Sequence, residues 1–189
     1  MASSAVYTGQ LQRPHALDWS RECMRRGNGA EVRFKELAQV RGWDVAPASR
    51  YEDMRRHVDQ ILTRETGNED KQKLRVDVKA RKKVSRGDAA CQDELIWLEL
   101  AGVNKGNRGW LYGSDADAVA FETTDGFMVV DRLELIQFVD KHVDRKQRVA
   151  TAREAVYKVY CRRGRLDELS LVPLKDILAS GAAELWLDE

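Results

Sequence analysis

The chain has 189 residues, of which 43% are hydrophobic and 33% are charged, and its formal net charge is +1. This length and composition suit one globular domain with a hydrophobic core and argue against a disordered chain. No apolar run is long enough to span a membrane, no secretory signal opens the chain, and the three cysteines are too scattered for a disulfide scaffold or a zinc site, so we expect a cytoplasmic protein.

The first half of the chain combines one helical pattern with several strand patterns. Residues 1–26 show little periodicity and are expected to be an N-terminal extension with a short helix around residues 17–25. The Gly-Asn-Gly at 27–29 separates it from a helix up to Arg41. In that helix Glu31 shares a side with Phe34. The expected strands span residues 43–49, 56–63 and 73–80, with a turn at 66–70.

The second half continues with strands, a glycine-rich loop and two helices. Further strands are expected at 94–100, 116–122 and 126–131, with the loop at 102–113, helices at 132–143 and from Pro173, and a hairpin-like pair at 155–161 and 168–172. Residues 27–189 are therefore predicted to form a single α/β (or α+β) domain that ends in a basic hairpin and a helix.

The strand at 73–80 carries the most informative pattern. Its strict alternation places Leu74, Val76, Val78 and Ala80 on the core face and five charged residues on the other face: Lys73, Arg75, Asp77, Lys79 and Arg81. One carboxylate among four cations on one face is typical of a site that attracts phosphate and retains a metal ligand. An exposed ion pair on a solvated sheet face is the alternative interpretation.

Two further carboxylates fit the first interpretation. Asp59 stands inside an otherwise strand-like run, where a carboxylate is unexpected, and a hairpin would bring it beside Asp77. Glu31 lies on the preceding helix, at the edge of its core-facing side. Three carboxylates and Lys79 would together form a site for a hard divalent cation.

The order of a glutamate on a first helix, an aspartate on a strand and Asp-x-Lys on the next strand resembles the PD-(D/E)XK nuclease superfamily. This superfamily includes restriction endonucleases and Holliday-junction resolvases. Asp59 matches its first acid, Asp77 its second acid and Lys79 its lysine, and Glu31 matches a helix glutamate found in some branches. The resemblance covers about residues 27–122, and Val58 replaces the proline that usually precedes the first acid.

The resemblance implies a restriction endonuclease-like fold, with a mixed central sheet and flanking helices. It also implies a catalytic set of Asp59, Asp77, Lys79 and Glu31, in which the carboxylates bind Mg²⁺ or Mn²⁺ and Lys79 assists the attacking water. The carbonyl of Val78 is an expected extra metal ligand. His57 and Glu99 are expected near this set, or else as a structural histidine and as a cross-strand partner of a lysine.

Basic residues gather in two blocks although the whole chain is nearly neutral. Residues 71–86 and 141–165 each carry a local charge of +7, and residues 166–189 are acidic. Such blocks can contact a phosphate backbone, can be ordinary solvated surface, or can pair with the acidic tail. The candidate nucleic-acid contacts are Lys73, Arg75, Arg81, Lys82, Lys83, Lys158, Arg162, Arg163 and Arg165.

Trp110 and Tyr112 in the glycine-rich loop are expected to pack beneath it, or else to stack on bases. The leading functional hypothesis is a metal-dependent nuclease, most simply an endonuclease acting on DNA in a bacterial cytoplasm, encoded by the bacterium or by a phage. A catalytically inactive nucleic-acid-binding protein, such as a phage regulator or defence inhibitor, is the first alternative. A protein-interaction module is the second, and a homodimer remains open.

Overall fold

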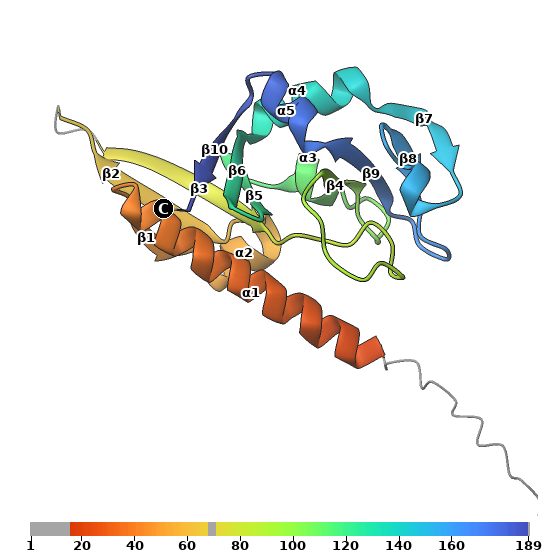
Figure 1. Ribbon diagram of the computed structural model, residues 1–189, viewed down its shortest axis with the longest axis horizontal. Helices are drawn as coiled ribbons and strands as arrows, with labels where there is room; N and C mark the ends of the chain where they lie inside the picture. The colour runs from red at the N-terminus through yellow and green to blue at the C-terminus, as the bar shows by residue number, and fades with distance from the viewer. Residues whose placement is uncertain (1–15, 68–70, 189) are drawn as a thin grey trace, which may run out of the picture.

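The computed structural model describes residues 16–67 and 71–188. Within these residues the chain forms a six-stranded mixed sheet, a four-stranded mixed sheet and several helices (Figure 1). The mixed α/β class expected from the sequence is confirmed. None of the described helices is long and apolar enough to cross a membrane.

The larger sheet has the strand order β1-β2-β3-β5-β6-β10. Its strands are β1 (Asp44–Pro47), β2 (Gln60–Glu65), β3 (Lys71–Lys79), β5 (Ala118–Thr123), β6 (Gly126–Asp131) and β10 (Ala183–Leu187). β3 and β5 run parallel, with Lys79 opposite Phe121, and the other neighbours are antiparallel. Because β2 and β3 form a hairpin, the start of β2 lies beside the end of β3.

Helix α1 (Ala16–Val40) covers one face of this sheet. Phe34 is fully buried, stacks on Trp186 of β10 and meets Phe127 of β6 edge-on. The apolar face predicted for β3 packs into the same cluster. The predicted break at 27–29 is wrong, because α1 runs through these residues without interruption, and residues 16–26 of the predicted extension belong to it.

The second sheet covers the opposite face and has the order β4-β9-β8-β7. Its strands are β4 (Leu95–Ala101), β9 (Glu168–Pro173), β8 (Lys158–Tyr160) and β7 (Asp144–Val149), and η1 (Ala152–Glu154) is a short 3-10 turn before β8. Leu98 of β4 and Val172 of β9 pack against Val119 and Met128 of the larger sheet. The end of the charged face of β3, with Asp77 and Lys79, is therefore covered by the second sheet, whereas Lys73 at its other end is exposed.

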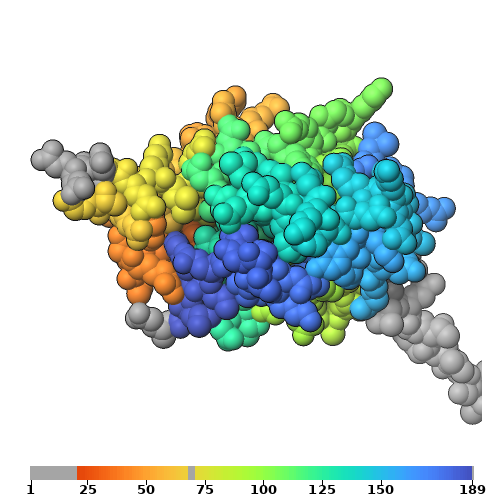
Figure 2. Space-filling model, turned by 90° about the horizontal axis from the view of Figure 1, so that it is seen from above, coloured from red at the N-terminus to blue at the C-terminus, as the bar shows by residue number. Residues whose placement is uncertain are grey.

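Four shorter helices complete the described fold: α2 (Arg50–Arg56), α3 (Gly109–Gly113), α4 (Arg132–His142) and α5 (Leu174–Ala179). Seen from above, α4 and α5 occupy neighbouring parts of one face (Figure 2). The expected helix at 132–143 is confirmed, and Asp131 caps it by accepting a 2.9 Å hydrogen bond from the Glu134 amide. Pro173 is the N-cap of α5 rather than its first residue.

Several expected boundaries shift in the structure. The strand expected at 56–63 begins only at Gln60, because α2 occupies its first residue. The glycine-rich loop contains α3, and α2, β7 and β10 were not expected at all. The strands expected at 94–100, 116–122 and 126–131 are confirmed, and β8 and β9 pair as expected, through Tyr160 and Leu169. Part of the turn expected at 66–70 lies outside the described residues.

Candidate active site

Asp77 is the most buried charged group of the β3 pattern, with 1% of its surface exposed. The Lys79 ammonium, on the same face of the strand, donates a hydrogen bond to Asp77 Oδ1. The second sheet and α3 shield this face, and Trp110 of α3 places its ring 5.1 Å from Lys79 Nζ. The alternative of an exposed ion pair on a solvated face is therefore wrong.

Asp59 lies in the connection just before β2, and not within a strand as expected. His57 ends α2 with a left-handed backbone (φ 49°), which turns the chain sharply toward the sheet. The Asp59 amide then donates to the Val76 carbonyl (2.9 Å), and its Oδ2 accepts from the Val78 amide (2.7 Å). These two bonds fix Asp59 beside the end of β3, next to Asp77.

The two carboxylates raise each other's energy in the ionised state. Burial, followed by the charge of Asp77, raises the pKa of Asp59 to about 7. Burial also raises the pKa of Asp77, although the neighbouring Lys79 works against this. With both groups ionised, Asp77 Oδ2 is buried and meets no hydrogen-bond donor among the described residues. A proton or a cation between Asp59 and Asp77 would satisfy it.

The donor set fits a hard divalent cation. No group of three or more His, Cys, Asp or Glu side chains within the described part of the chain is arranged as a metal cage. Mg²⁺ does not need one, because it typically takes one or two carboxylates and completes its shell with water and substrate oxygens. Two close carboxylates, one with an unsatisfied buried oxygen, meet that requirement.

Glu31 lies at the edge of this pair. Its backbone carbonyl accepts a 2.6 Å hydrogen bond from the buried Gln60 side chain, which ties α1 to the start of β2. Burial, and next the negative charge of Asp59, raise the pKa of Glu31. The Glu31 carboxylate is therefore electrostatically coupled to the site but does not join Asp59 and Asp77 in a three-carboxylate cluster.

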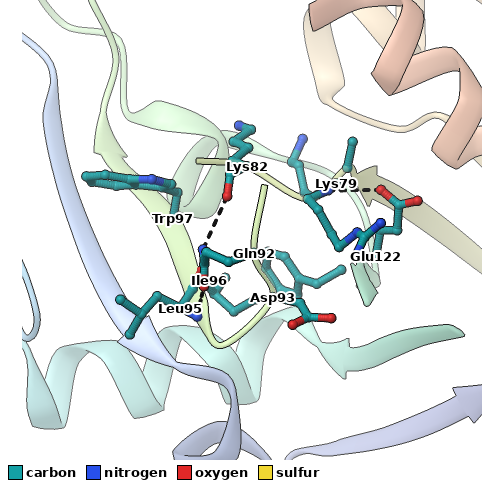
Figure 3. A pocket seen from close by; sticks show the side chains of 11 residues that line it. Lys79, Lys82, Gln92, Asp93, Leu95, Ile96, Trp97 and Glu122 are labelled. Atoms are coloured by element: carbon teal, nitrogen blue, oxygen red, sulfur yellow. Dashed lines mark hydrogen bonds between the residues drawn. The ribbon is translucent and has the colours of Figure 1, made fainter. Parts of the chain in front are cut away.

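A small pocket opens at the end of β3, and Lys79 and Lys82 both lie on its wall (Figure 3). Gln92 holds this wall together, because its side-chain amide donates to the Lys82 carbonyl (3.2 Å) and to the Leu95 carbonyl (2.9 Å). Desolvation by the surrounding protein, and then the positive charge of Lys79, lower the pKa of Lys82, although its side chain is exposed to solvent. Two lysines thus border a small pocket at this end of β3, and the wall of this pocket includes neither Asp59 nor Asp77.

His57 and Glu99 both belong to the surroundings of the site, as expected. Burial and the charge of Lys79 lower the pKa of the half-buried His57, so its imidazole is neutral at pH 7. Glu99 of β4 influences both His57 and Lys82 through its negative charge. Glu99 therefore belongs to the site surroundings, but it lies in a different sheet from β3 and forms no ion pair with a lysine of the described residues, so the expected cross-strand pair is not formed.

The first basic block is only partly free to contact a ligand. Arg75 makes a two-pronged ion pair with Asp117, and Arg81 donates to the Thr124 hydroxyl. Lys73 and Lys82 remain exposed, and Lys83 is partly exposed. Other groups of the protein therefore already engage Arg75 and Arg81, and their contact with phosphate stays a prediction.

The second basic block pairs extensively with the acidic tail, which was one of the alternatives. Arg162 forms an ion pair with the fully buried Asp167. Glu168 accepts from two arginines of β7, Arg145 at 3.0 Å and Arg148 at 2.6 Å. Lys158 is partly buried, whereas Arg163 and Arg165 are exposed at the turn around Gly164.

Two features near the site escaped the sequence analysis. Trp110 is buried, as the packing interpretation expected, but nothing in the sequence indicated that it would lie over Lys79. Tyr51 and Arg56 border a second pocket that includes Val58, and they were missed because the polar sequence of α2 carries no helical periodicity.

Comparisons of the chain with protein-family models, with curated proteins and with solved structures gave no match.

Proposed function

We propose that this protein is a metal-dependent nuclease of the PD-(D/E)XK type. The observation that carries the proposal is the buried Asp59–Asp77 pair with Lys79 bonded to Asp77. Folding a chain so that two carboxylates share one buried space costs free energy, which a bound divalent cation would offset. A purely structural role would be served as well by one carboxylate and one lysine.

In the proposed site, Asp59 and Asp77 would hold Mg²⁺ or Mn²⁺, with the Val78 carbonyl as a further ligand. The cation would lower the pKa of a bound water and offset charge on the phosphate. Lys79 orients the water or neutralises the charge that develops in the transition state. Glu31, coupled to Asp59 through its charge, would hold a second water or cation at the edge.

The order of these groups along the elements supports a restriction endonuclease-like arrangement. Glu31 lies on α1, Asp59 precedes β2, and Asp77 and Lys79 end β3. Nucleic acid, most simply DNA, is the proposed substrate, because a phosphodiester is the anion that this combination of cations and metal ligands would hydrolyse. The exposed Lys73, Lys82, Arg163 and Arg165 are available to contact its backbone.

A nucleic-acid-binding protein without catalysis is the second candidate. The observation that favours it is the Lys79–Asp77 ion pair, which neutralises one of the two acids without any metal. In that case the cationic end of β3 would bind phosphate, and Asp77 would only position Lys79.

Cleavage of plasmid DNA and of branched and single-stranded oligonucleotides separates the two candidates. We expect cleavage with Mg²⁺ or Mn²⁺, none with EDTA, and none with the Asp77→Asn variant, whose DNA affinity should be unchanged or higher because a negative charge is removed. Circular dichroism checks that the variant is folded. A folded Asp77→Asn protein that cleaves as fast as the parent would refute the assignment.

A further inference from the structure

Helix α2 exposes side chains that the fold does not use. None of its described residues is buried, and polar contacts hold it in place. The Ser49–Glu52 capping box fixes its start, and at its end the Arg56 carbonyl accepts a 2.9 Å hydrogen bond from the Asp115 amide. Tyr51 is 62% exposed although aromatic rings contribute most when they are buried.

Tyr51 borders a pocket that lies directly beside the candidate active site. The pocket has a volume of about 270 Å³, and Arg75 of β3 and Val58 form part of its wall. Val58 immediately precedes Asp59, and Arg75 lies two residues before Asp77 on the same face of β3, so the pocket is next to the carboxylate pair on both segments although neither carboxylate lines it. Sites for complete small molecules begin at roughly 300 Å³, so this pocket suits one flat ring system rather than a whole ligand.

The charges of the pocket are balanced. Arg56 pairs with Asp115, and Arg75 pairs with Asp117 at 2.8 Å. Neutralised arginines hold a bare phosphate weakly, but guanidinium donors beside carboxylate acceptors match the mixed hydrogen-bonding edge of a nucleobase. The Arg56 guanidinium carbon lies 5.5 Å from the centre of the Tyr51 ring, which helps to hold the ring in place.

We propose that this pocket binds the base of a nucleotide next to the bond that Asp59 and Asp77 act on. The base stacks on Tyr51, and its edge is read by Arg56, Arg75 and the carboxylates of Glu52 and Asp115. The inference rests on the proposed nuclease function and gives that site a subsite for one nucleobase. It predicts a preference for intact bases at one position of the bound strand.

Equilibrium binding in EDTA tests the subsite without any cleavage. The probes are short single-stranded and duplex oligonucleotides in which one base at a time is replaced by an abasic site. We expect one abasic position to weaken binding to the parent protein by about tenfold, a typical effect of removing one base–aromatic stack. Tyr51→Ala should weaken binding of the intact strand by a similar factor. Removing the base at that position should then not weaken binding to Tyr51→Ala any further.

Met54→Ala is the matched control, because Met54 lies on the same helix, is 61% exposed and does not line the pocket. It should behave as the parent protein, as should Tyr51→Phe, which keeps the ring. The subsite is refuted if neither oligonucleotide binds, or if no abasic position weakens binding. It is also refuted if Tyr51→Ala loses as much affinity at the abasic position as the parent protein does, or if Met54→Ala weakens binding as much as Tyr51→Ala.

The same experiment distinguishes the subsite from the catalytic proposal. If the protein cleaves DNA with metal, but the effects of Tyr51→Ala and of the abasic substitution are independent (no coupling), the subsite is overturned and the nuclease function stands. Coupling in EDTA with no cleavage in Mg²⁺ or Mn²⁺ supports the base pocket and overturns catalysis.

Discussion

Two local features place Asp59 and Asp77 side by side: the alternation of side chains along β3 for Asp77, and the turn at His57 before β2 for Asp59. The alternation of β3 predicted the face on which Asp77 and Lys79 lie, because side chains of a strand alternate strictly. The sequence also predicted that Asp59 lies beside Asp77. The position of Asp59, however, depends on the left-handed backbone of His57 and on the hydrogen bond from the Val78 amide. A left-handed histidine at a helix end has no clear sequence signal, so this detail could not be predicted.

The raised pKa of Asp59 makes the stability of the metal-free protein depend on pH. The folded protein holds a proton up to about pH 7, whereas the unfolded chain releases it near the ordinary aspartate value of about 4. The folded state therefore binds more protons across this window, and the free energy of unfolding should fall as the pH rises from 4 to 7 and then level off. A pKa shift of this size corresponds to at most about 4 kcal/mol. Because Asp59 is partly exposed, solvent screening makes the actual fall smaller.

Asp59→Asn should flatten this profile, since asparagine cannot titrate but can still accept the hydrogen bond from the Val78 amide. Urea unfolding in EDTA at several pH values measures it, with Asp125→Asn, a change of an exposed carboxylate, as the control. Parallel profiles for the parent and Asp59→Asn would show that Asp59 does not carry the buried proton.

Among the elements, those with a strong local pattern were predicted and those defined by distant partners were not. β3 and α4 follow clear periods of two and about 3.6 residues. β10 was missed because its single buried residue, Trp186, gives no alternation, and all of β7 except Val149 is exposed. β4 was predicted as a strand, but its membership of a second sheet depends on pairing with β9, about 70 residues later.

The continuity of α1 leads to a prediction about Gly27 and Gly29. Both are helical, and an added Cβ would meet no atom within 4 Å at either position. Gly27→Ala and Gly29→Ala should each raise the free energy of unfolding by about 0.5–1 kcal/mol, because alanine loses less backbone entropy in a helix.

Thermal or urea unfolding measures the two variants. Gly109→Ala is the contrasting control, since its backbone is left-handed (φ 69°) and a Cβ would lie 2.4 Å from the Glu99 carbonyl oxygen, so it should destabilise the protein. Destabilisation by the two α1 substitutions would contradict a continuous helix at 27–29.

At the scale of the whole molecule, the arginines at the end of the second basic block (residues 141–165) divide into two groups. Arg162 neutralises the buried Asp167, whereas Arg163 and Arg165 are exposed and make no ion pair with another described residue. Arg162→Ser should lower the free energy of unfolding by about 3 kcal/mol, because it leaves a buried carboxylate without its partner. The Arg163→Ser, Arg165→Ser double variant should leave stability unchanged.

For DNA binding we expect the opposite: the double variant should weaken it, and Arg162→Ser should affect it less. The double variant should weaken binding to different sequences alike and flatten the log–log salt dependence by about one unit for each phosphate that the protein no longer neutralises. Urea unfolding and binding at several salt concentrations give both readouts. An unchanged salt slope would remove this turn from the nucleic-acid surface and leave the block as the partner of the acidic tail.

Binding of Mn²⁺ tests the central claim most directly, because it requires no knowledge of the substrate. Crystals soaked in Mn²⁺ and measured at its absorption edge should show an anomalous peak between the Asp59 and Asp77 carboxylates, with Lys79 displaced from Asp77 Oδ1. The same soak of Asp77→Asn crystals should show none. A parent protein with an empty position between these carboxylates at saturating Mn²⁺ would contradict the account.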